Sequence, residues 1–168
     1  MKFIILLPLA ILSITDATAS PIPPEVKGSQ WQYVDGDSGR SLILMDTKRI
    51  AKGNGTTGSY ILRTVTIKPY YLDDGRNYSD SLEQYQIECQ KKTINMISYS
   101  LYQADGSLVK SDSTTSNTLN FVDVQNKLPG AWNAFSVICG GKPFPISQAV
   151  DLSISNEKIQ DFMHGKPQ

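Results

Sequence analysis

The sequence predicts an α+β fold, mainly a meander of antiparallel β-strands with one short helix stapled by a disulfide. Apolar and polar residues alternate with a period of two between Leu82 and Tyr102, in segments separated by short polar stretches. After Pro129-Gly130 the apolar spacing changes to three and four residues, which is typical of a helix. One of the two cysteines, Cys89, lies in the alternating part, and the other, Cys139, lies in the helical part.

The composition fits one folded domain. Of the 168 residues, 40% are hydrophobic and 19% are charged, and 12 glycines and 9 prolines are spread along the chain. These values exclude a coiled coil, a collagen and a wholly disordered chain. Lysine and arginine total 16, and so do aspartate and glutamate. The chain therefore lacks a broad cationic field, and nucleic acid is not an expected partner.

Residues 1–19 have the pattern of a removable export signal. Lys2 is followed by an apolar run from Phe3 to Ile14, and Ala17-Thr18-Ala19 predicts cleavage before Ser20. A membrane-spanning helix needs about 20 apolar residues, so an uncleaved anchor is the weaker alternative and no membrane span is expected. No cysteine stands at the end of the signal, so we expect no lipid anchor there. Residues 20–28 form a Pro-rich lead-in before the domain, which we place at residues 29–140.

The strands follow from alternation and from turn residues. The predicted strands are the segment around Trp31 and Tyr33, Ser41–Asp46, Tyr60–Tyr71, Leu82–Cys89, Thr93–Tyr102 and Leu108–Lys110. Asn54-Gly55 and Asp105-Gly106 are typical turn dipeptides. By composition, Leu72–Asp80 and Ser111–Asn120 are loops, and we expect Phe121–Val124 to be a short strand or extended piece.

The helix is predicted over Ala131–Cys139. Trp132, Phe135 and Cys139 share one helical face, which we expect to press onto Tyr85 and Ile87 of the sheet. Residues 141–168 form a C-terminal extension with two alternatives, a helical turn from Asn156 to Phe162 or a frayed tail.

The two cysteines predict one structural disulfide, Cys89–Cys139. An even pair in an exported domain most simply forms a disulfide. The loop of about 50 residues that it closes would contribute about 4 kcal/mol in the chain-entropy model. Two buried free thiols are the alternative. A zinc site is not expected, because two cysteines and one distant histidine do not supply four ligands.

No catalytic, cofactor-binding or metal-binding residue is predicted, and the chain is not expected to be an enzyme. The only histidine, His164, lies near the chain end, where it is poorly placed to serve as an oriented base. The acidic residues of the polar segments are better explained as hydrogen-bonding partners of turn backbone: Asp35, Asp37, Asp73, Asp74 and Asp80. Asp35–Gly39 resembles the start of a calcium loop but fails the EF-hand spacing. No Gly-rich phosphate loop or dinucleotide fingerprint occurs, so no cofactor is expected.

A group of tyrosines and basic residues is the candidate recognition surface. Tyrosine and arginine are enriched at protein interfaces because they combine a large contact area with polar groups. The group surrounds the segment 72–80 and consists of Lys68, Tyr70, Tyr71, Arg76 and Tyr78. Ordinary sheet packing with tyrosine hydroxyls facing water is the alternative.

The order of features from Trp31 onward resembles the surface-adhesin protein E family of Gram-negative bacteria. The resemblance covers about residues 29 to 140. Its residues are Trp31 and Tyr33, then Asp46, Arg49 and Ile50, then Tyr85, Cys89, Lys91 and Lys92, then Tyr102, Asp105, Gly106 and Val109, and finally Pro129, Gly130, Trp132 and Cys139.

The resemblance implies an antiparallel sheet with a small helix held by one disulfide, exposed on or near the cell surface. It also implies non-enzymatic binding of a host extracellular protein such as vitronectin, laminin or plasminogen. No binding residue is carried over, because no basic host-binding segment matches. The alternative is a periplasmic accessory or envelope-stress protein that is not displayed on the surface, and a carboxylate-based enzyme is the least favoured hypothesis.

Overall fold

The computed structural model describes residues 28–36, 40–52, 56–113, 118–124, 128, 130–142, 153–154 and 156–163. The strands in these ranges are β1 (Trp31–Asp35), β2 (Ser41–Asp46), β3 (Ala51–Lys52), β4 (Thr57–Tyr71), β5 (Asn77–Glu88), β6 (Thr93–Tyr102), β7 (Leu108–Asp112), β8 (Leu119–Asn120) and β9 (Ser153–Ile154). The helices are α1 (Phe121–Val124), α2 (Ala131–Ile138) and α3 (Asn156–Met163), with a 3₁₀ turn η2 (Thr47–Arg49). The predicted signal and nearly all of the Pro-rich lead-in lie outside these ranges.

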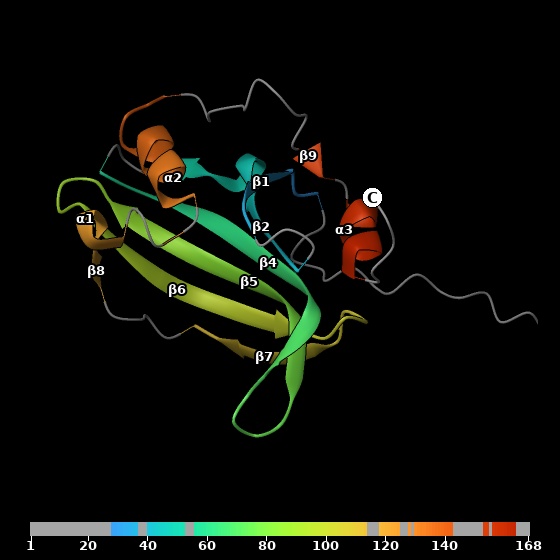
Figure 1. Ribbon diagram of the computed structural model, residues 1–168. Helices are drawn as coiled ribbons and strands as arrows, with labels where there is room; N and C mark the ends of the chain where they lie inside the picture. The colour runs from blue at the N-terminus through green and yellow to red at the C-terminus, as the bar shows by residue number, and fades with distance from the viewer. Residues whose placement is uncertain are drawn as a thin grey trace, which may run out of the picture.

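The strands form one antiparallel sheet, which confirms the predicted fold class. The strand order is β7-β6-β5-β4-β2-β1-β9, with β3 also paired to β4 and β8 to β6 (Figure 1). The run from β4 to β7 is a meander, since each strand pairs with the next along the chain. β6 occupies Thr93–Tyr102, the range that the alternation predicts.

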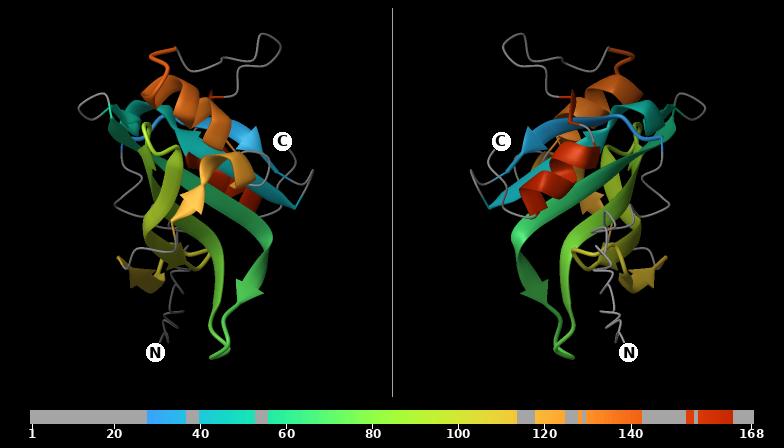
Figure 2. Two further views of the ribbon diagram at one scale, coloured as in Figure 1. Left: turned by 90° about the vertical axis from the view of Figure 1, so that its left-hand side faces the viewer. Right: turned by 90° about the vertical axis from the view of Figure 1, so that its right-hand side faces the viewer.

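A helix covers each face of the sheet, α2 on one and α3 on the other (Figure 2). Successive residues of a strand point to opposite faces, so Leu44 and Met45 enter different cores. The core on the α2 face contains Met45, Tyr60, Leu62, Tyr85, Ile87 and Ile94, with Phe121 and the buried residues of α2. The core on the α3 face contains Trp31, Leu44, Val65, Leu82 and Tyr102, with Ile159 and Met163 of α3.

The C-terminal extension takes the helical alternative over 156–163. β9 pairs with β1, with Trp31 opposite Ile154, and α3 follows. Ile159, Phe162 and Met163 are buried, so burial of apolar surface holds the helix on the sheet. The frayed-tail alternative is therefore wrong for these residues. His164 lies outside the described residues.

Two segments differ from their prediction. The predicted loop over Leu72–Asp80 is a tight turn, and β5 begins at Asn77. Phe121–Val124 is a helical turn, α1, and not an extended piece. Both segments are polar or short, so their local composition is a weak signal, and strand pairing and packing against the rest of the chain outweigh it.

The helix α2 forms where the sequence predicts it, and of the predicted face Phe135 and Cys139 pack against the core with Tyr85 and Ile87, but Trp132 does not. The buried residues of α2 are Ala131, Ala134, Val137 and Ile138, whereas Trp132 is 56% exposed. A Cβ on Gly58 of β4 would collide with the Ile138 side chain of α2. α2 thus approaches β4 closely, and small side chains fit this gap better than an indole ring. The predicted burial of Trp132 against Tyr85 and Ile87 is wrong.

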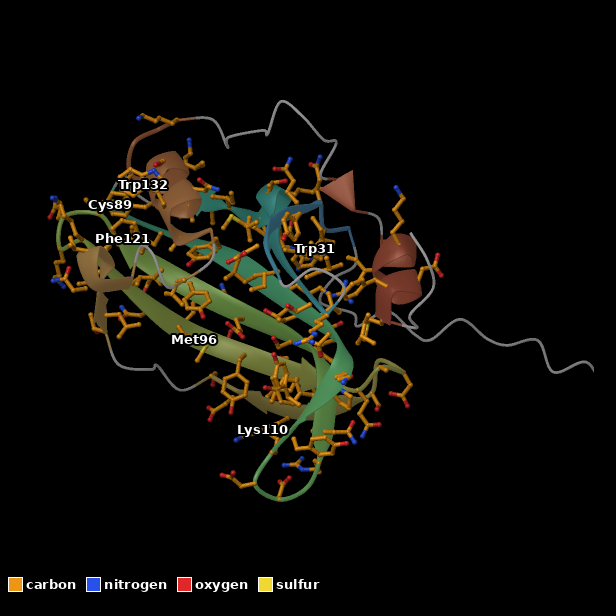
Figure 3. All side chains as sticks on the ribbon, in the orientation of Figure 1. Trp31, Cys89, Met96, Lys110, Phe121 and Trp132 are labelled. Carbon is orange, nitrogen blue, oxygen red and sulfur yellow. A yellow bond between two sulfur atoms is a disulfide. The ribbon has the colours of Figure 1, made fainter. Side chains whose placement is uncertain are left out.

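The disulfide joins Cys89 and Cys139, as predicted, with a Cα–Cα distance of 5.5 Å. Cys89 follows the last residue of β5, and Cys139 is the C-cap of α2. The bond lies at the end of the molecule that also carries Phe121 and Trp132 (Figure 3). Both cysteines pack against the core of the α2 face, so the disulfide fixes α2 to the sheet.

Candidate binding site on the β4–β5 hairpin

The outer part of the β4–β5 hairpin extends past the rest of the sheet (Figure 1). The pairing of β2 with β4 ends at Thr66, and the pairing of β6 with β5 ends at Asp80. Beyond these points Tyr70 pairs with Tyr78 and Tyr71 with Asn77. Within the described residues, Ile67 N still donates to Arg40 O at 3.0 Å, and past this point no strand pairs with the outer hairpin on either side.

A bulge in β4 separates the outer hairpin from the sheet. Val65 lies opposite Asp80 and Tyr70 lies opposite Tyr78, so the segment 66–69 of β4 faces only Ser79 of β5. Extra residues in one strand bend it and re-aim its side chains. Pro69 has no N–H to donate, which suits it to such an irregularity. Thr66 Oγ1 donates to Lys68 O at 2.8 Å and stabilises the bulge.

The tyrosines of the predicted recognition group meet on this hairpin. The ring centroids of Tyr70 and Tyr78 are 5.6 Å apart. Tyr70 is 53% exposed and Tyr71 is 70% exposed, while Tyr78 is half-buried. Tyr70 and Tyr71 are therefore mostly exposed and are not packed within the sheet.

Arg76 holds the hairpin turn instead of joining the tyrosines. Its guanidinium contacts Asp74 Oδ2 at 2.7 Å and donates to Val109 O of β7. The Arg76 side chain and the Arg76 backbone N–H hold the pKa of Asp74 below its usual value through hydrogen bonds. Lys110, which follows Val109 on β7, is labelled in Figure 3. The outer hairpin is thus tied to β7 by one side chain.

Two pockets adjoin the bulge and share Thr66 and Tyr70. The larger has a volume of about 330 Å³ and is lined by Arg40, Ser41, Thr66, Ile67, Lys68, Pro69 and Tyr70. The smaller has a volume of about 120 Å³ and is lined by Thr64, Thr66, Tyr70, Tyr78, Ser79, Ser81 and Glu83. The larger contains two cationic side chains and the smaller contains one carboxylate, so the two pockets carry opposite charge.

Glu83 is oriented by its neighbours on β5. Tyr85 Oη donates to Glu83 Oε2 at 2.7 Å, and Ser81 Oγ donates to Glu83 Oε1 at 3.3 Å. Tyr60 stacks on Tyr85 with a centroid distance of 5.3 Å. Burial, with the Glu83 carboxylate adding to it, raises the pKa of Tyr60, Tyr78 and Tyr85 above the usual value for a phenol.

The sequence found part of this site. It singled out Lys68, Tyr70, Tyr71, Arg76 and Tyr78, and the structure brings Tyr70 and Tyr78 together. The sequence-based prediction missed Glu83, although a signal was present. Glu83, Tyr85 and Ile87 are two residues apart in an alternating strand, so their side chains point to the same face. A charged residue on this otherwise apolar face could have indicated a site. The pocket beside Glu83 depends on the bulge in β4, which no local pattern predicts.

The acidic residues assigned to turns have mixed outcomes. Asp74 accepts from Arg76 N at 3.1 Å, and Asp35 accepts from Gly36 N at 2.8 Å, as expected for turn residues. Asp80 is not a turn residue, because it is buried in β5 and paired with Arg63. Asp37 lies outside the described residues. In the described part of the chain, no three His, Cys, Asp or Glu side chains cluster to hold a metal ion.

Asp46, one of the residues that carry the family resemblance, is fully buried at the end of β2. It accepts hydrogen bonds from Gln30 N at 3.0 Å and Lys48 N at 3.1 Å and pairs with Arg49 at 3.4 Å. These contacts cap η2, so Asp46 has a structural role. None of the described helices has the length and apolar character that crossing a membrane requires.

Comparison with known proteins gives a family and a likeness to solved structures. The structure of Haemophilus influenzae protein E matches with 14% identity and a TM-score of 0.46, covering 76% of this chain and 96% of that chain. No curated protein matches the sequence. The family model of the surface-adhesin protein E matches residues 31–140, from the start of β1 to just past Cys139. The chain belongs to the surface-adhesin protein E family.

Proposed function

We propose that this protein is an exported, non-enzymatic adhesin-like domain that binds a host extracellular protein, of which vitronectin and laminin are the first to test. Family membership supports an adhesin-like envelope protein. The observation that carries the proposal is the outer β4–β5 hairpin, on which Tyr70 and Tyr71 are 53% and 70% exposed. Exposed large aromatic side chains on a projecting element are typical of a recognition surface.

The hairpin is suited to binding because it is held in shape before contact. The Asp74–Arg76 pair and the contact of Arg76 with β7 fix the turn. A preformed element loses little conformational freedom on binding, so more of the contact energy becomes affinity. Tyrosine adds contact area at low entropic cost, since only two side-chain torsions are fixed.

Binding is tested with the full exported chain immobilised and with vitronectin or laminin in solution. Tyr71→Ala is expected to weaken binding and leave thermal stability unchanged, because the ring is mostly exposed. Trp132→Ala is the matched control, since Trp132 is also mostly exposed but lies at the opposite end of the sheet. Loss of binding in Trp132→Ala with full binding in Tyr71→Ala would contradict the hairpin assignment. If the chain binds neither vitronectin nor laminin, the proposed partners are contradicted.

Surface display is tested on intact cells that produce the protein. Added protease is expected to cleave the displayed protein from outside. Protection until the outer membrane is permeabilised would instead support the periplasmic accessory role. Measuring a periplasmic marker in the same samples controls for leakage.

A further inference from the structure

Glu83 is a half-buried carboxylate without a cationic partner. Its oxygens accept hydrogen bonds from Tyr85 and Ser81, and it makes no ion pair in the described part of the chain. A partly desolvated charge is costly unless an opposite charge compensates it. The described residues therefore form no ion pair with this negative charge, and Arg49, which lines a neighbouring pocket with Glu83, pairs with Asp46 instead.

The pocket above Glu83 contains acceptors and aromatic rings. Thr64, Thr66, Ser79 and Ser81 contribute hydroxyl groups, and Tyr70 and Tyr78 contribute rings that lie 5.6 Å apart with an interplanar angle of 37°. The lining includes no lysine or arginine. Hydroxyl and carboxylate oxygens accept hydrogen bonds, and aromatic faces attract cations.

We infer that this pocket binds an alkylammonium group, the end of a lysine side chain on the bound protein. The inference rests on the proposed function, because it names which side chain of the partner enters the hairpin site. The pocket volume of about 120 Å³ suits a compact end group. An ammonium has three donors that point in different directions, whereas a guanidinium needs acceptors paired in one plane.

The charges that line the adjoining, larger pocket disfavour a cation there, and this favours binding of the cation in the Glu83 pocket. Arg40 and Lys68 line that larger pocket, so a positive group there meets like charges. A lysine on the partner is therefore directed to one side of Tyr70. This arrangement makes Glu83 the specificity-determining residue of the hairpin site.

The test uses the full exported chain labelled with ¹⁵N and Nα-acetyl-lysine N-methylamide as the probe. Saturable amide shifts are expected at Ser79, Ser81 and Glu83. The norleucine analogue, which has the same carbon chain without the charge, is expected to give none. Equal shifts with norleucine, tighter binding of the arginine analogue, or shifts only elsewhere in the protein would overturn the inference. This comparison requires no variant.

Glu83→Gln tests the role of the charge, because glutamine keeps an acceptor for the Tyr85 hydroxyl. Affinity for the lysine probe is expected to fall about tenfold or more. Glu88→Gln is the matched control, since Glu88 lies on the same strand but pairs with Lys91 at 2.8 Å. Unchanged affinity in a folded Glu83→Gln protein would overturn the inference.

The result is separable from the test of host-protein binding. Probe binding without binding of vitronectin or laminin would support the pocket and contradict the proposed partners. If Glu83→Gln leaves host-protein binding unchanged and the lysine probe causes no amide shifts, the proposed function is supported and the proposed lysine pocket is contradicted.

Discussion

Arg63 and Asp80 form an ion pair across β4 and β5 that is closed off from solvent. The side chains are 1% and 2% exposed, and Arg63 Nε donates to Asp80 Oδ1 at 3.0 Å. The Arg63 guanidinium also lies over the Trp31 ring, 5.7 Å from its centroid. Burial raises the pKa of Asp80, and the hydrogen bond and charge of Arg63 oppose this shift. The pair thus places two charges inside the core of the α3 face.

Asp80→Asn is expected to destabilise the protein strongly. It removes the carboxylate charge that pairs with the buried Arg63 guanidinium, and breaking a buried ion pair typically costs about 3–5 kcal/mol. Chemical denaturation with urea measures the loss. Asp74→Asn, which breaks the exposed pair with Arg76, is the control and should change the unfolding midpoint little. Equal effects of the two substitutions would contradict the importance of burial.

The Cys89–Cys139 disulfide is expected to be complete and structural. Mass spectrometry of the non-reduced protein should find the mass of the all-thiol chain less two hydrogens. A Cys89→Ser, Cys139→Ser double variant should lose about 2–5 kcal/mol of stability. Alkylation of both thiols without reductant would disprove the bond.

Phe121 and Trp132 stack, yet their truncation should have different effects. Phe121 is 3% exposed and lies 4.3 Å from the Phe135 ring centroid, whereas Trp132 is 56% exposed. Phe121→Ala should cost about 3–5 kcal/mol. Trp132→Ala should cost about 1–2 kcal/mol, since it loses mainly the ring contacts with Phe121 and Phe135 and little buried area. Thermal melts of both variants make the comparison, and a larger loss for Trp132→Ala would restore the face of α2 predicted from sequence.

Tyr60 and Tyr85 should stay protonated in alkali for as long as the protein is folded. Burial raises the pKa of both phenols well above the usual value for a tyrosine. An acid whose pKa is higher in the folded state stabilises that state fully below the unfolded pKa, and the contribution is lost as pH rises through the folded value. Stability should therefore fall above about pH 10.

The measurement is a titration of phenolate absorbance in the native and the denatured chain. The chain has 8 tyrosines. In the native protein, Tyr60 and Tyr85 should ionise only when the protein unfolds. If all tyrosines ionise while the protein is still folded, the burial of the Tyr60 and Tyr85 rings is contradicted.

The sequence by itself determined the antiparallel meander, the helix after Gly130 and the cysteine pairing. These features have local signals: the period of side-chain direction in a strand, the change to helical spacing, and the presence of only two cysteines. β6 and α2 accordingly lie where the pattern places them. Family membership also follows from the order of such features along the chain.

Only the tertiary structure decided which side chains these elements bury. Spacing predicted one face of α2, with Trp132 on it, whereas the close approach of α2 to Gly58 buries Ala131 and Ala134. The local sequence predicts that Asp80 is a turn residue, but in the structure Asp80 pairs with Arg63, which is 17 residues away. The Glu83 pocket depends on a bulge in β4 and on the pairing of Tyr70 with Tyr78. In each case a contact between distant segments outweighs the local preference, because burial and charge pairing depend on neighbours in space.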